Sequence, residues 1–456
     1  MKTASRKIEF QLGHRSRGGV RGAGLALATA ALAAVGFVVR IPALAESKGS
    51  GAGAWLPAAP MLQGRESFTA TALKNGKVLV AGTAFGTPEG PGDPTKTALL
   101  YDPVKNAWTQ TAPMITPRTI HSAALLADGR VLVAGGGGIS GFLNTAEIYD
   151  PSTEKWSQAG TIGQGGRHWH TATLLNNGKV LVTGGRDQSH ATSYTDAWLY
   201  EPKSNNWTAT GSFEVGRRSH TATLLSDGAV LITGGQLSGH DPSLKDALIY
   251  DPGAGVFKPV PSLMNEGRAT HTATMLPGGK VLLAGGNNQL VGGGPASSLA
   301  SIEIYDPKAQ TFTLGQAMAT PRYAHAATVL SGGKALAVGG NGGGTVGNAK
   351  NVPLFTAESY DPVTEKWRPA GTLKPVATKE GDPLAYEAAV VLSQKPCGQN
   401  CGKVLALGSD SAQLFTPTAA TAPASKQSSL PLAPLAGGVV VVLLGALVLI
   451  WRSRRN

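Results

Sequence analysis

The stretch RHWHTATLLNNGKVLVTGG at residues 167–185 holds the residue types of this chain that are best suited to chemistry. Two histidines, His168 and His170, flank Trp169, and Arg167 precedes them. An imidazole can bind a metal or move a proton near neutral pH. An indole beside a guanidinium can stack on a sugar or on a peptide side chain. Which of these activities applies depends on which of the four residues belong to the framework of the fold.

The same pattern recurs along the chain, and this recurrence separates framework residues from special ones. Each full copy has an arginine, a histidine three residues later, a strand-like stretch, a tight turn and a glycine pair. Copies begin at 118, 167, 217, 268 and 322, with weaker copies at 65 and 386. A Tyr-Asp-Pro type of signature follows each copy, and in the first six copies a tryptophan or phenylalanine comes shortly after it. The copies are about 50 residues apart, so the framework is a repeat.

Each copy predicts four short strands, here named a to d in chain order. Apolar stretches on both sides of an Asn-Gly, Asp-Gly or Gly-Gly pair indicate a hairpin of strands a and b. One four-stranded unit cannot bury its own face, so we expect seven units to stack radially. The last copy lacks the aromatic residue of strand d, whereas Trp55 stands alone before the first copy. We therefore expect Trp55 to supply strand d of the last unit and to close the ring.

The glycine pair, the Tyr-Asp-Pro and the spaced tryptophan resemble the kelch repeat over roughly residues 55–417. The resemblance implies an all-β, seven-bladed β-propeller, the fold that also forms the central domain of galactose-oxidase-like proteins. It further implies that the b–c loops and d–a links form a binding face at one mouth of the channel. The b–c loops of this chain are long and differ from one another, so function is expected there.

Residues that occur in nearly every copy are expected to belong to the blades. The histidines should pack and hydrogen-bond near the innermost strand, and the tryptophans should form the core between blades. An arginine side chain with five donors is suited to tying loop carbonyls between neighbouring blades. The repeated residues are His121, His170, His220, His271 and His325, with Arg65, Arg118, Arg167, Arg217, Arg268 and Arg322.

Only His168 and Trp169 are particular to the third copy, so the candidate ligand-binding site starts from them. The following loop and the b–c loop of the next copy complete the set. The candidate residues are His168, Trp169, Arg186, Asp187, His190, Tyr194, His240 and Asp241. Aromatic and charged side chains of these types suit stacking on, and bidentate hydrogen bonding to, a sugar or a peptide side chain.

Two other interpretations of these residues stay open. They are solvated loop residues without a special role, or His168, His190 and His240 converge from three loops on a metal. We predict no catalytic residue, no resident metal and no cofactor.

Cys397 and Cys401 are the two cysteines of the chain and lie in PCGQNCG, an insertion where other copies have the a–b turn. Two thiols four residues apart in one extracellular loop most simply form a local disulfide, with a redox or metal role as the alternative. Galactose-oxidase-like copper enzymes need a cysteine that is cross-linked to a tyrosine. Two cysteines in one turn, opposite the variable loops, argue against that chemistry.

The charge of the chain lies mainly at its two ends. The formal net charge is +12, but residues 1–45 contain seven Lys or Arg and one acid, and residues 431–456 contain three Arg and no acid. The remaining residues hold 30 basic and 27 acidic side chains. A nucleic-acid-binding protein should carry its positive charge on the folded body, so nucleic acid is excluded as a partner.

The two ends are typical of targeting segments. Residues 1–45 predict a signal peptide cut after Ala45, with an uncleaved anchor as the alternative. A linker at 46–54 precedes the propeller, and a Pro/Ala/Ser/Thr-rich stalk at 418–431 follows it. The uncharged segment 432–451 is long enough for a transmembrane helix, and 452–456 form a basic cytoplasmic tail. Processing of the C-terminal segment as a sorting signal is a second interpretation.

Together these features predict an extracytoplasmic, membrane-anchored, monomeric propeller that binds a protein or a glycan through its variable loops. Two other classes stay open: a carbohydrate-active or galactose-oxidase-like enzyme, and a structural scaffold of the cell envelope. The sequence names no ligand, because fold does not determine function.

Overall fold

The computed structural model describes residues 53–82, 95–189, 193–238, 241–288, 296–343, 345–346, 352–375, 388–392, 395–408 and 411–417. The predicted signal peptide, stalk, transmembrane segment and basic tail lie outside these residues. The described part of the chain contains no helix with the length and apolarity of a membrane span. Its one helical element is a single 3-10 turn, Gly398–Asn400.

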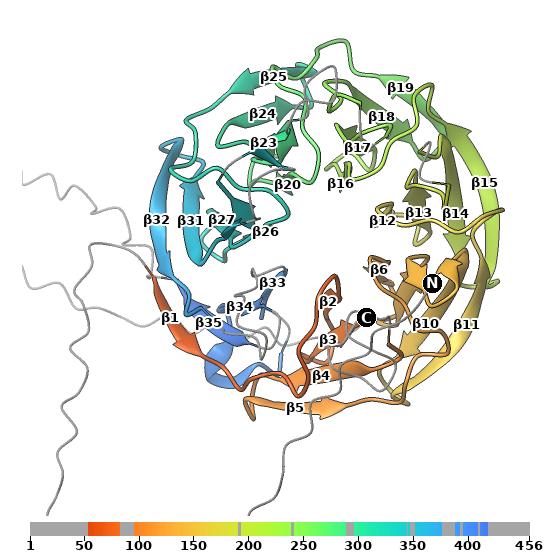
Figure 1. The fold of residues 1–456 in the computed structure, drawn as a ribbon, viewed down its shortest axis with the longest axis vertical. Helices are drawn as coiled ribbons and strands as arrows, with labels where there is room; N and C mark the ends of the chain where they lie inside the picture. The colour runs from red at the N-terminus through yellow and green to blue at the C-terminus, as the bar shows by residue number, and fades with distance from the viewer. Residues whose placement is uncertain are drawn as a thin grey trace, which may run out of the picture. The chain divides into compact units, whose positions relative to one another are not determined.

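Seven four-stranded antiparallel sheets, the blades, form a closed ring in the described residues (Figure 1). Blade 1 contains β2 (Thr69–Ala72), β3 (Val78–Ala81), β4 (Ala98–Asp102) and β5 (Ala107–Gln110). Blade 2 contains β6 (Ser122–Leu125), β7 (Val131–Ala134), β10 (Thr145–Asp150) and β11 (Lys155–Thr161). Blade 3 contains β12 (Thr171–Leu174), β13 (Val180–Thr183), β14 (Asp196–Glu201) and β15 (Asn206–Ser212). Blade 4 contains β16 (Thr221–Leu224), β17 (Val230–Thr233), β18 (Ala247–Asp251) and β19 (Val256–Pro259).

The remaining blades complete the ring. Blade 5 contains β20 (Thr272–Met275), β21 (Val281–Ala284), β24 (Ile302–Asp306) and β25 (Thr311–Leu314). Blade 6 contains β26 (Ala326–Val329), β27 (Ala335–Val338), β31 (Thr356–Asp361) and β32 (Lys366–Thr372). Blade 7 contains β33 (Ala388–Val391), β34 (Val404–Leu407), β35 (Ala412–Thr416) and β1 (Ala54–Pro57). Each innermost strand touches the innermost strands of both neighbouring blades, including β2 and β33.

Strand β1 closes the ring as the sequence predicts. It pairs antiparallel with β35, and Trp55 stands opposite Phe415, with 4.9 Å between the two ring centroids. The Trp55 Nε1–H also donates a hydrogen bond of 2.7 Å to the Ala370 carbonyl in blade 6. The first and last described strands therefore share one blade, which removes a free sheet edge.

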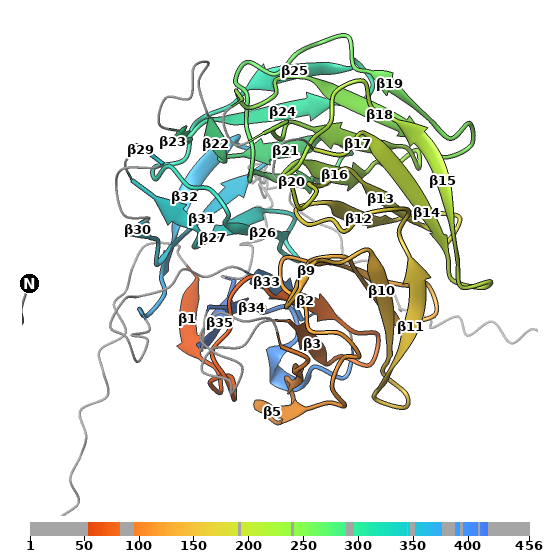
Figure 2. The same ribbon diagram turned by 45° about the vertical axis from the view of Figure 1, so that its right-hand side comes forward.

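Short strands extend the b–c loops beyond the blades. They are β8 (Gly137–Gly138), β9 (Gly141–Phe142), β22 (Asn287–Asn288), β23 (Ala296–Ser298), β28 (Asn341–Gly342), β29 (Thr345–Val346) and β30 (Val352–Pro353). Strand β23 pairs with β29, so the loops of blades 5 and 6 are joined. Figure 2 shows β22, β23, β29 and β30 on one side of the blades.

The core lies between adjacent blades, which explains the apolar run of strand b. In β7, Val131, Leu132, Val133 and Ala134 are all buried, because each face of a blade packs on a neighbour. The tyrosine of the Tyr-Asp-Pro signature is buried as well, and it pairs with the aromatic residue of strand d. In blade 2 the Tyr149 and Trp156 ring centroids are 5.1 Å apart.

The repeated histidines join neighbouring blades, as expected. His121 Nε2 shares a hydrogen bond of 2.9 Å with Thr69 Oγ1 on the innermost strand of blade 1. Burial lowers the pKa of His121 and His170 to about 3, so both rings are neutral. The first glycine of each pair makes room for this ring. A Cβ on Gly135, whose φ is +62°, would lie 2.6 Å from His170 Cε1.

The repeated arginines act within one blade, so the prediction that their side chains tie neighbouring blades is wrong. The Arg118 guanidinium donates a hydrogen bond of 2.8 Å to the Gly135 carbonyl and one of 2.6 Å to Glu147 Oε1. All three residues belong to blade 2. Strand c supplies this carboxylate, and the sequence interpretation had not considered it. The contact between blades comes from the backbone instead, because Gly136 N–H donates to the Arg167 carbonyl at 2.8 Å.

The predicted disulfide between Cys397 and Cys401 is present in the β33–β34 link. The inserted turn packs on blade 1. Cys397 is buried, and Asn400 Nδ2 donates a hydrogen bond of 2.6 Å to the Pro103 carbonyl. The insertion therefore ties the last blade to the first on the face opposite the b–c loops.

Candidate functional site

The two faces of the ring differ in how their connections are built. The a–b and c–d connections are short turns, and we call their side the turn face. The b–c loops and d–a links form the other side, the loop face. In five blades, the residue three places before strand a forms a β-bridge with the residue that follows the glycine pair of the same blade. These bridges are Thr119 with Gly137, His168 with Arg186, Arg218 with Gln236, Ala269 with Asn287, and Tyr323 with Asn341.

The next residue along the chain has a left-handed backbone in every one of these copies. Its φ is 53° at Trp169, 55° at Ser219 and 51° at Thr270. Residues other than glycine adopt this conformation rarely, so the surrounding structure must impose it. Ser219 N–H donates to the Trp169 carbonyl and Thr270 N–H to the Ser219 carbonyl, both at 2.9 Å. The repeat therefore fixes where the Trp169 side chain starts but not what it is.

His168 packs inside the protein rather than facing a ligand. It is 2% exposed, and its ring meets Phe142 of β9 edge to face, with 3.8 Å between centroids. The His168 ring also lies beside the Trp169 ring, with 4.2 Å between the two centroids. The role of His168 is thus to support the indole from the side of blade 2.

Trp169 carries two guanidinium groups over its ring. The Arg218 Cζ atom lies 4.8 Å from the ring centroid, and the Arg186 Cζ atom lies 5.8 Å from it. Such contacts are favourable cation–π interactions. Burial, together with the nearby Arg186 charge, lowers the pKa of Arg218 to about 10, so the side chain stays charged at neutral pH.

Sequence reasoning missed Arg218 and Phe142. Arg218 has the same place in the fourth copy that His168 has in the third, so alignment of the copies could have found it. Phe142 lies in the b–c loop of blade 2, which was not considered as part of the site. We call Phe142, His168, Trp169, Arg186 and Arg218 the mouth cluster; it draws residues from blades 2, 3 and 4.

The other predicted site residues do not all join this cluster. Tyr194 belongs to the framework. The Arg167 Cζ atom lies 4.4 Å from the centroid of the Tyr194 ring, and the Tyr194 hydroxyl donates a hydrogen bond of 3.3 Å to the Gly166 carbonyl. Asp187 is half-buried beside Arg186 and accepts a hydrogen bond of 2.7 Å from Ser189 Oγ.

Asp241 is half-buried in the loop of blade 4. Within the described part of the chain, no hydrogen bond or ion pair joins it to the mouth cluster. His190 and His240 lie outside the described residues, so the alternative of a three-histidine metal site is not tested. The described residues contain no group of three His, Cys, Asp or Glu side chains close enough to share a metal.

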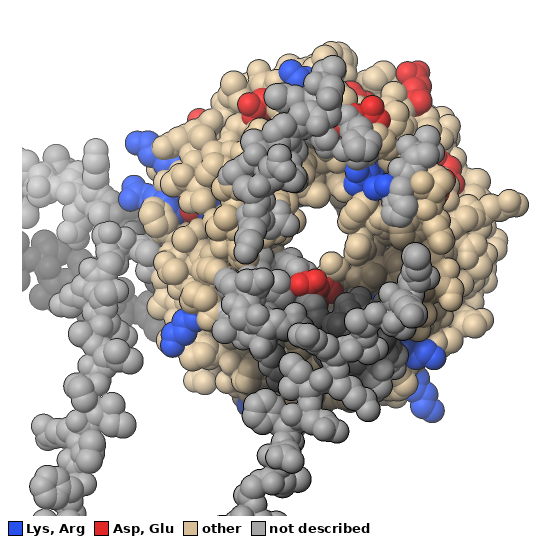
Figure 3. Space-filling model, in the orientation of Figure 1, with Lys and Arg blue, Asp and Glu red and all other residues tan. Residues whose placement is uncertain are grey.

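The distribution of charge singles out the same part of the loop face. Figure 3 shows a group of basic side chains at the rim of the open channel, beside β12 and β16. Most other described atoms around this rim are uncharged in that view, apart from an acidic patch near β2. Arg186 and Arg218 belong to blades 3 and 4, where the basic group lies.

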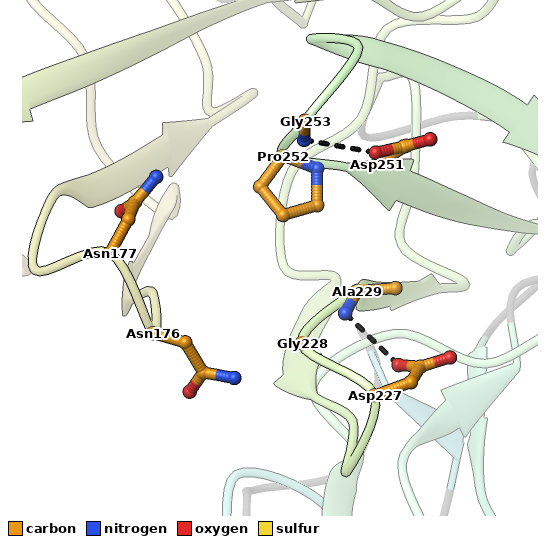
Figure 4. Close-up of a pocket in the computed structure, with 8 residues that line it drawn as sticks. All are labelled: Asn176, Asn177, Asp227, Gly228, Ala229, Asp251, Pro252 and Gly253. Atoms are coloured by element: carbon orange, nitrogen blue, oxygen red, sulfur yellow. Dashed lines mark hydrogen bonds between the residues drawn. The ribbon is translucent and has the colours of Figure 1, made fainter.

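A pocket of about 510 Å³ lies on the turn face between blades 3 and 4 (Figure 4). It exists because Ala229 stands where other blades have a long basic residue. In blade 5, Lys280 occupies that position and its Nζ lies 3.3 Å from Asp306 Oδ2. The two carboxylates of the pocket stabilise the turns to which they belong. Asp227 accepts a hydrogen bond of 3.0 Å from Ala229 N–H, and Asp251 accepts one of 2.9 Å from Gly253 N–H (Figure 4).

Comparison with known proteins agrees with the fold. The model of the KLHDC2/KLHL20/DRC7 Kelch-repeats domain matches residues 57–235, and kelch-motif models match 267–319 and 322–374. The F-box/kelch-repeat protein OR23 of Arabidopsis thaliana is 33% identical over 113 residues, which are 22% of this chain and 26% of that protein. A galactose oxidase of Gibberella zeae is 32% identical over 84 residues, which are 18% of this chain and 11% of that protein.

Among solved structures, a fungal alcohol oxidase of the AA5 family, in complex with copper, superimposes with a TM-score of 0.61. The match covers 80% of this chain and 76% of that one, at 19% sequence identity. An identity this low supports the fold alone. The repeated kelch models, the kelch-repeat relatives and the closed ring of seven blades agree with one another. The chain is a member of the kelch-repeat β-propeller family.

Proposed function

We propose that this kelch propeller is a binding module that holds a protein ligand on its loop face, centred on the mouth cluster. The observation that carries the proposal is the cluster itself. Trp169, Arg186 and Arg218 meet at the channel rim from two blades, and no feature of the repeat requires them. Aromatic and arginine side chains are enriched at the energetic centres of protein interfaces.

A protein ligand fits these side chains better than a neutral glycan. A pyranose ring stacks on a free aromatic face, but two guanidinium groups lie over the Trp169 ring. The Tyr194 ring is likewise covered by Arg167. The predicted pair of stacking aromatics is therefore engaged with arginine side chains. The polar partners that remain suit hydrogen bonding to backbone carbonyls and acidic groups of a polypeptide.

We further propose that the propeller works outside the cytoplasm and is held at the membrane. The support is in the sequence: a signal-like segment at 1–45, a stalk at 418–431 and an apolar segment at 432–451. A disulfide in the β33–β34 link suits an oxidising compartment.

The enzyme alternative rests on the resemblance to copper oxidases and conflicts with the cysteines of this chain. The cross-linked cysteine of such an oxidase must be free to bond to a tyrosine. Cys397 and Cys401 are the two cysteines of the sequence, and they are bonded to each other on the turn face. The donor set for that cofactor therefore does not fit.

The test is to probe the full-length protein with an array of short blocked peptides of defined sequence and with a glycan array. We expect peptides to bind and Trp169→Ala to weaken their binding about tenfold, because cation–π partners and contact area are lost. Tyr323→Ala is the matched control, since Tyr323 lies at the same mouth in blade 6. Binding of glycans alone, or an equal loss in both variants, would contradict the proposal.

A further inference from the structure

In the described part of the chain, Arg218 has no acidic partner, unlike the arginine beside it. The Arg217 guanidinium donates a hydrogen bond of 2.6 Å to Asp246 Oδ2 and one of 3.1 Å to the Gly234 carbonyl. Arg218 is 7% exposed. Within the described residues its guanidinium has no ion pair, and its Cζ atom lies 4.8 Å from the Trp169 ring centroid.

The undescribed parts of the two adjoining loops contain no carboxylate. The parts of the two adjoining loops that the structure does not describe are residues 190–192 and 239–240. They read His-Ala-Thr and Gly-His, and neither contains an acid. The other charge that acts on Arg218 is Arg186, which is positive. Two cations are thus held near one indole at the rim of the channel.

A buried charge without a counter-ion is unfavourable, and a carboxylate is the group that best satisfies a guanidinium. Five of the six framework arginines, from Arg118 to Arg322, have such a carboxylate, whereas Arg65 donates to the Gly82 and Thr97 carbonyls and to Thr97 Oγ1. Each of these five is bonded to an aspartate or glutamate in strand c or, for Arg217, directly before it, as Arg268 is to Glu303 at 2.9 Å. Arg218 is also buried, although at 7% exposed it is less enclosed than they are, and within the described residues it has no carboxylate partner.

We propose that the mouth cluster is a carboxylate site, in which an aspartate or glutamate side chain of a protein ligand bonds to Arg218. Arg186 adds a second positive charge, and Trp169 holds the Arg218 guanidinium in place. The inference rests on the proposed function and deepens it, because it names the chemical group that the loop face recognises. An acidic sugar presents the same group, so the experiment must separate the two sources.

The test compares three probes on the full-length protein by calorimetry or fluorescence anisotropy at low salt. They are a blocked glutamate-rich peptide, the same peptide with glutamine in place of glutamate, and an oligosaccharide of galacturonic acid. We expect the glutamate peptide to bind at least about tenfold more tightly than the glutamine peptide. Its affinity should fall as salt is raised.

Substitutions locate the effect. Arg218→Gln should reduce binding of the glutamate peptide to the level of the glutamine peptide, while Arg218→Lys should retain part of it. Arg368→Gln, at an exposed arginine of β32, is the matched control and should leave binding unchanged. Arg218→Gln should not lower the Tm, because it removes an unpaired buried charge.

Each other result decides against the inference in a distinct way. Equal binding of the two peptides, lost in Trp169→Ala, would overturn the carboxylate site and leave the binding module intact. Binding of the galacturonic acid probe without the glutamate peptide would overturn the protein ligand. Binding of the glutamate peptide that persists in Arg218→Gln would place the carboxylate elsewhere.

Discussion

Two stretches of the channel mouth, at blades 3–4 and at blades 5–6, have the same backbone conformation and differ in their side chains. At blades 5–6, Ala269 and Tyr323 form the β-bridges to the residues after the glycine pairs. The Ala324 N–H donates a hydrogen bond of 2.9 Å to the Thr270 carbonyl. At blades 3–4 the equivalent positions hold His168, Trp169 and Arg218, with two guanidinium groups over one indole.

The difference teaches that the repeat provides positions and that a few substitutions give them a function. The left-handed residue of each copy is held by hydrogen bonds of the backbone, so its side chain is not needed for folding. A protein can therefore place a bulky aromatic residue at one such position without changing the blade. The following predictions test this separation of framework from site.

The largest effect should come from a framework arginine. Arg268 and Glu303 are both fully buried and lie 2.9 Å apart. Arg268→Gln leaves the carboxylate without its partner, and we expect it to destabilise the protein by about 3–5 kcal/mol. Chemical denaturation measures this loss. Arg218→Gln is the control at the mouth, and a similar loss there would contradict the division between framework and site.

Acid should destabilise the framework through its neutral histidines. Burial lowers the pKa of His121, His170 and His325 to about 3 from an ordinary value of 6.5. The folded protein binds fewer protons than the unfolded chain between these values. Stability is therefore complete above pH 6.5 and is lost as the pH falls from 6.5 towards 3. At pH 5 the loss is on the order of 2 kcal/mol for each histidine.

Thermal melts between pH 7 and pH 4 measure this acid effect. His121→Phe should reduce it, because Phe68 occupies the equivalent position in the first copy and does not titrate. A Tm that stays constant down to pH 4 would show that the rings are not buried in the neutral state.

A smaller change in stability should accompany removal of the indole. Trp169→Gly takes away a side chain from a residue with φ of 53°, a conformation that glycine adopts without strain. We expect the Tm to change little, while affinity for a peptide ligand of the loop face falls about tenfold. Calorimetry and a thermal melt of the same sample separate the two quantities. A strong loss of Tm would mean that Trp169 belongs to the framework.

The smallest effect should come from the turn face. Ala229→Lys restores the basic residue that other blades have, and its amine can pair with Asp251 as Lys280 pairs with Asp306. An exposed pair of this kind contributes at most about 1 kcal/mol. We expect a slightly higher Tm and unchanged binding on the loop face. Reduced binding in this variant would move the ligand site to the pocket of the turn face.

The sequence predicted the structure correctly where it depends on local spacing or on a recurring pattern of residues. The seven blades, the Trp55 closure and the Cys397–Cys401 bond could be predicted because each depends on local spacing or on a pattern that recurs. The arginines were misassigned, since their carboxylate partners lie on strand c, about 30 residues away, and only pairing of the strands brings them together. Glu147, for example, reaches Arg118 through the register of β10 with β7.

The sequence by itself determined the framework: the number of blades, the strand that closes them, and the two residues, His168 and Trp169, that depart from the repeat. Periodic sequence carries this information because every copy must bury the same faces. The tertiary structure alone decided what surrounds those two residues. It buried His168, joined Tyr194 to the framework, and brought Arg218 of the next blade over the indole. Such contacts depend on how neighbouring blades are stacked, and no single copy of the repeat encodes that arrangement.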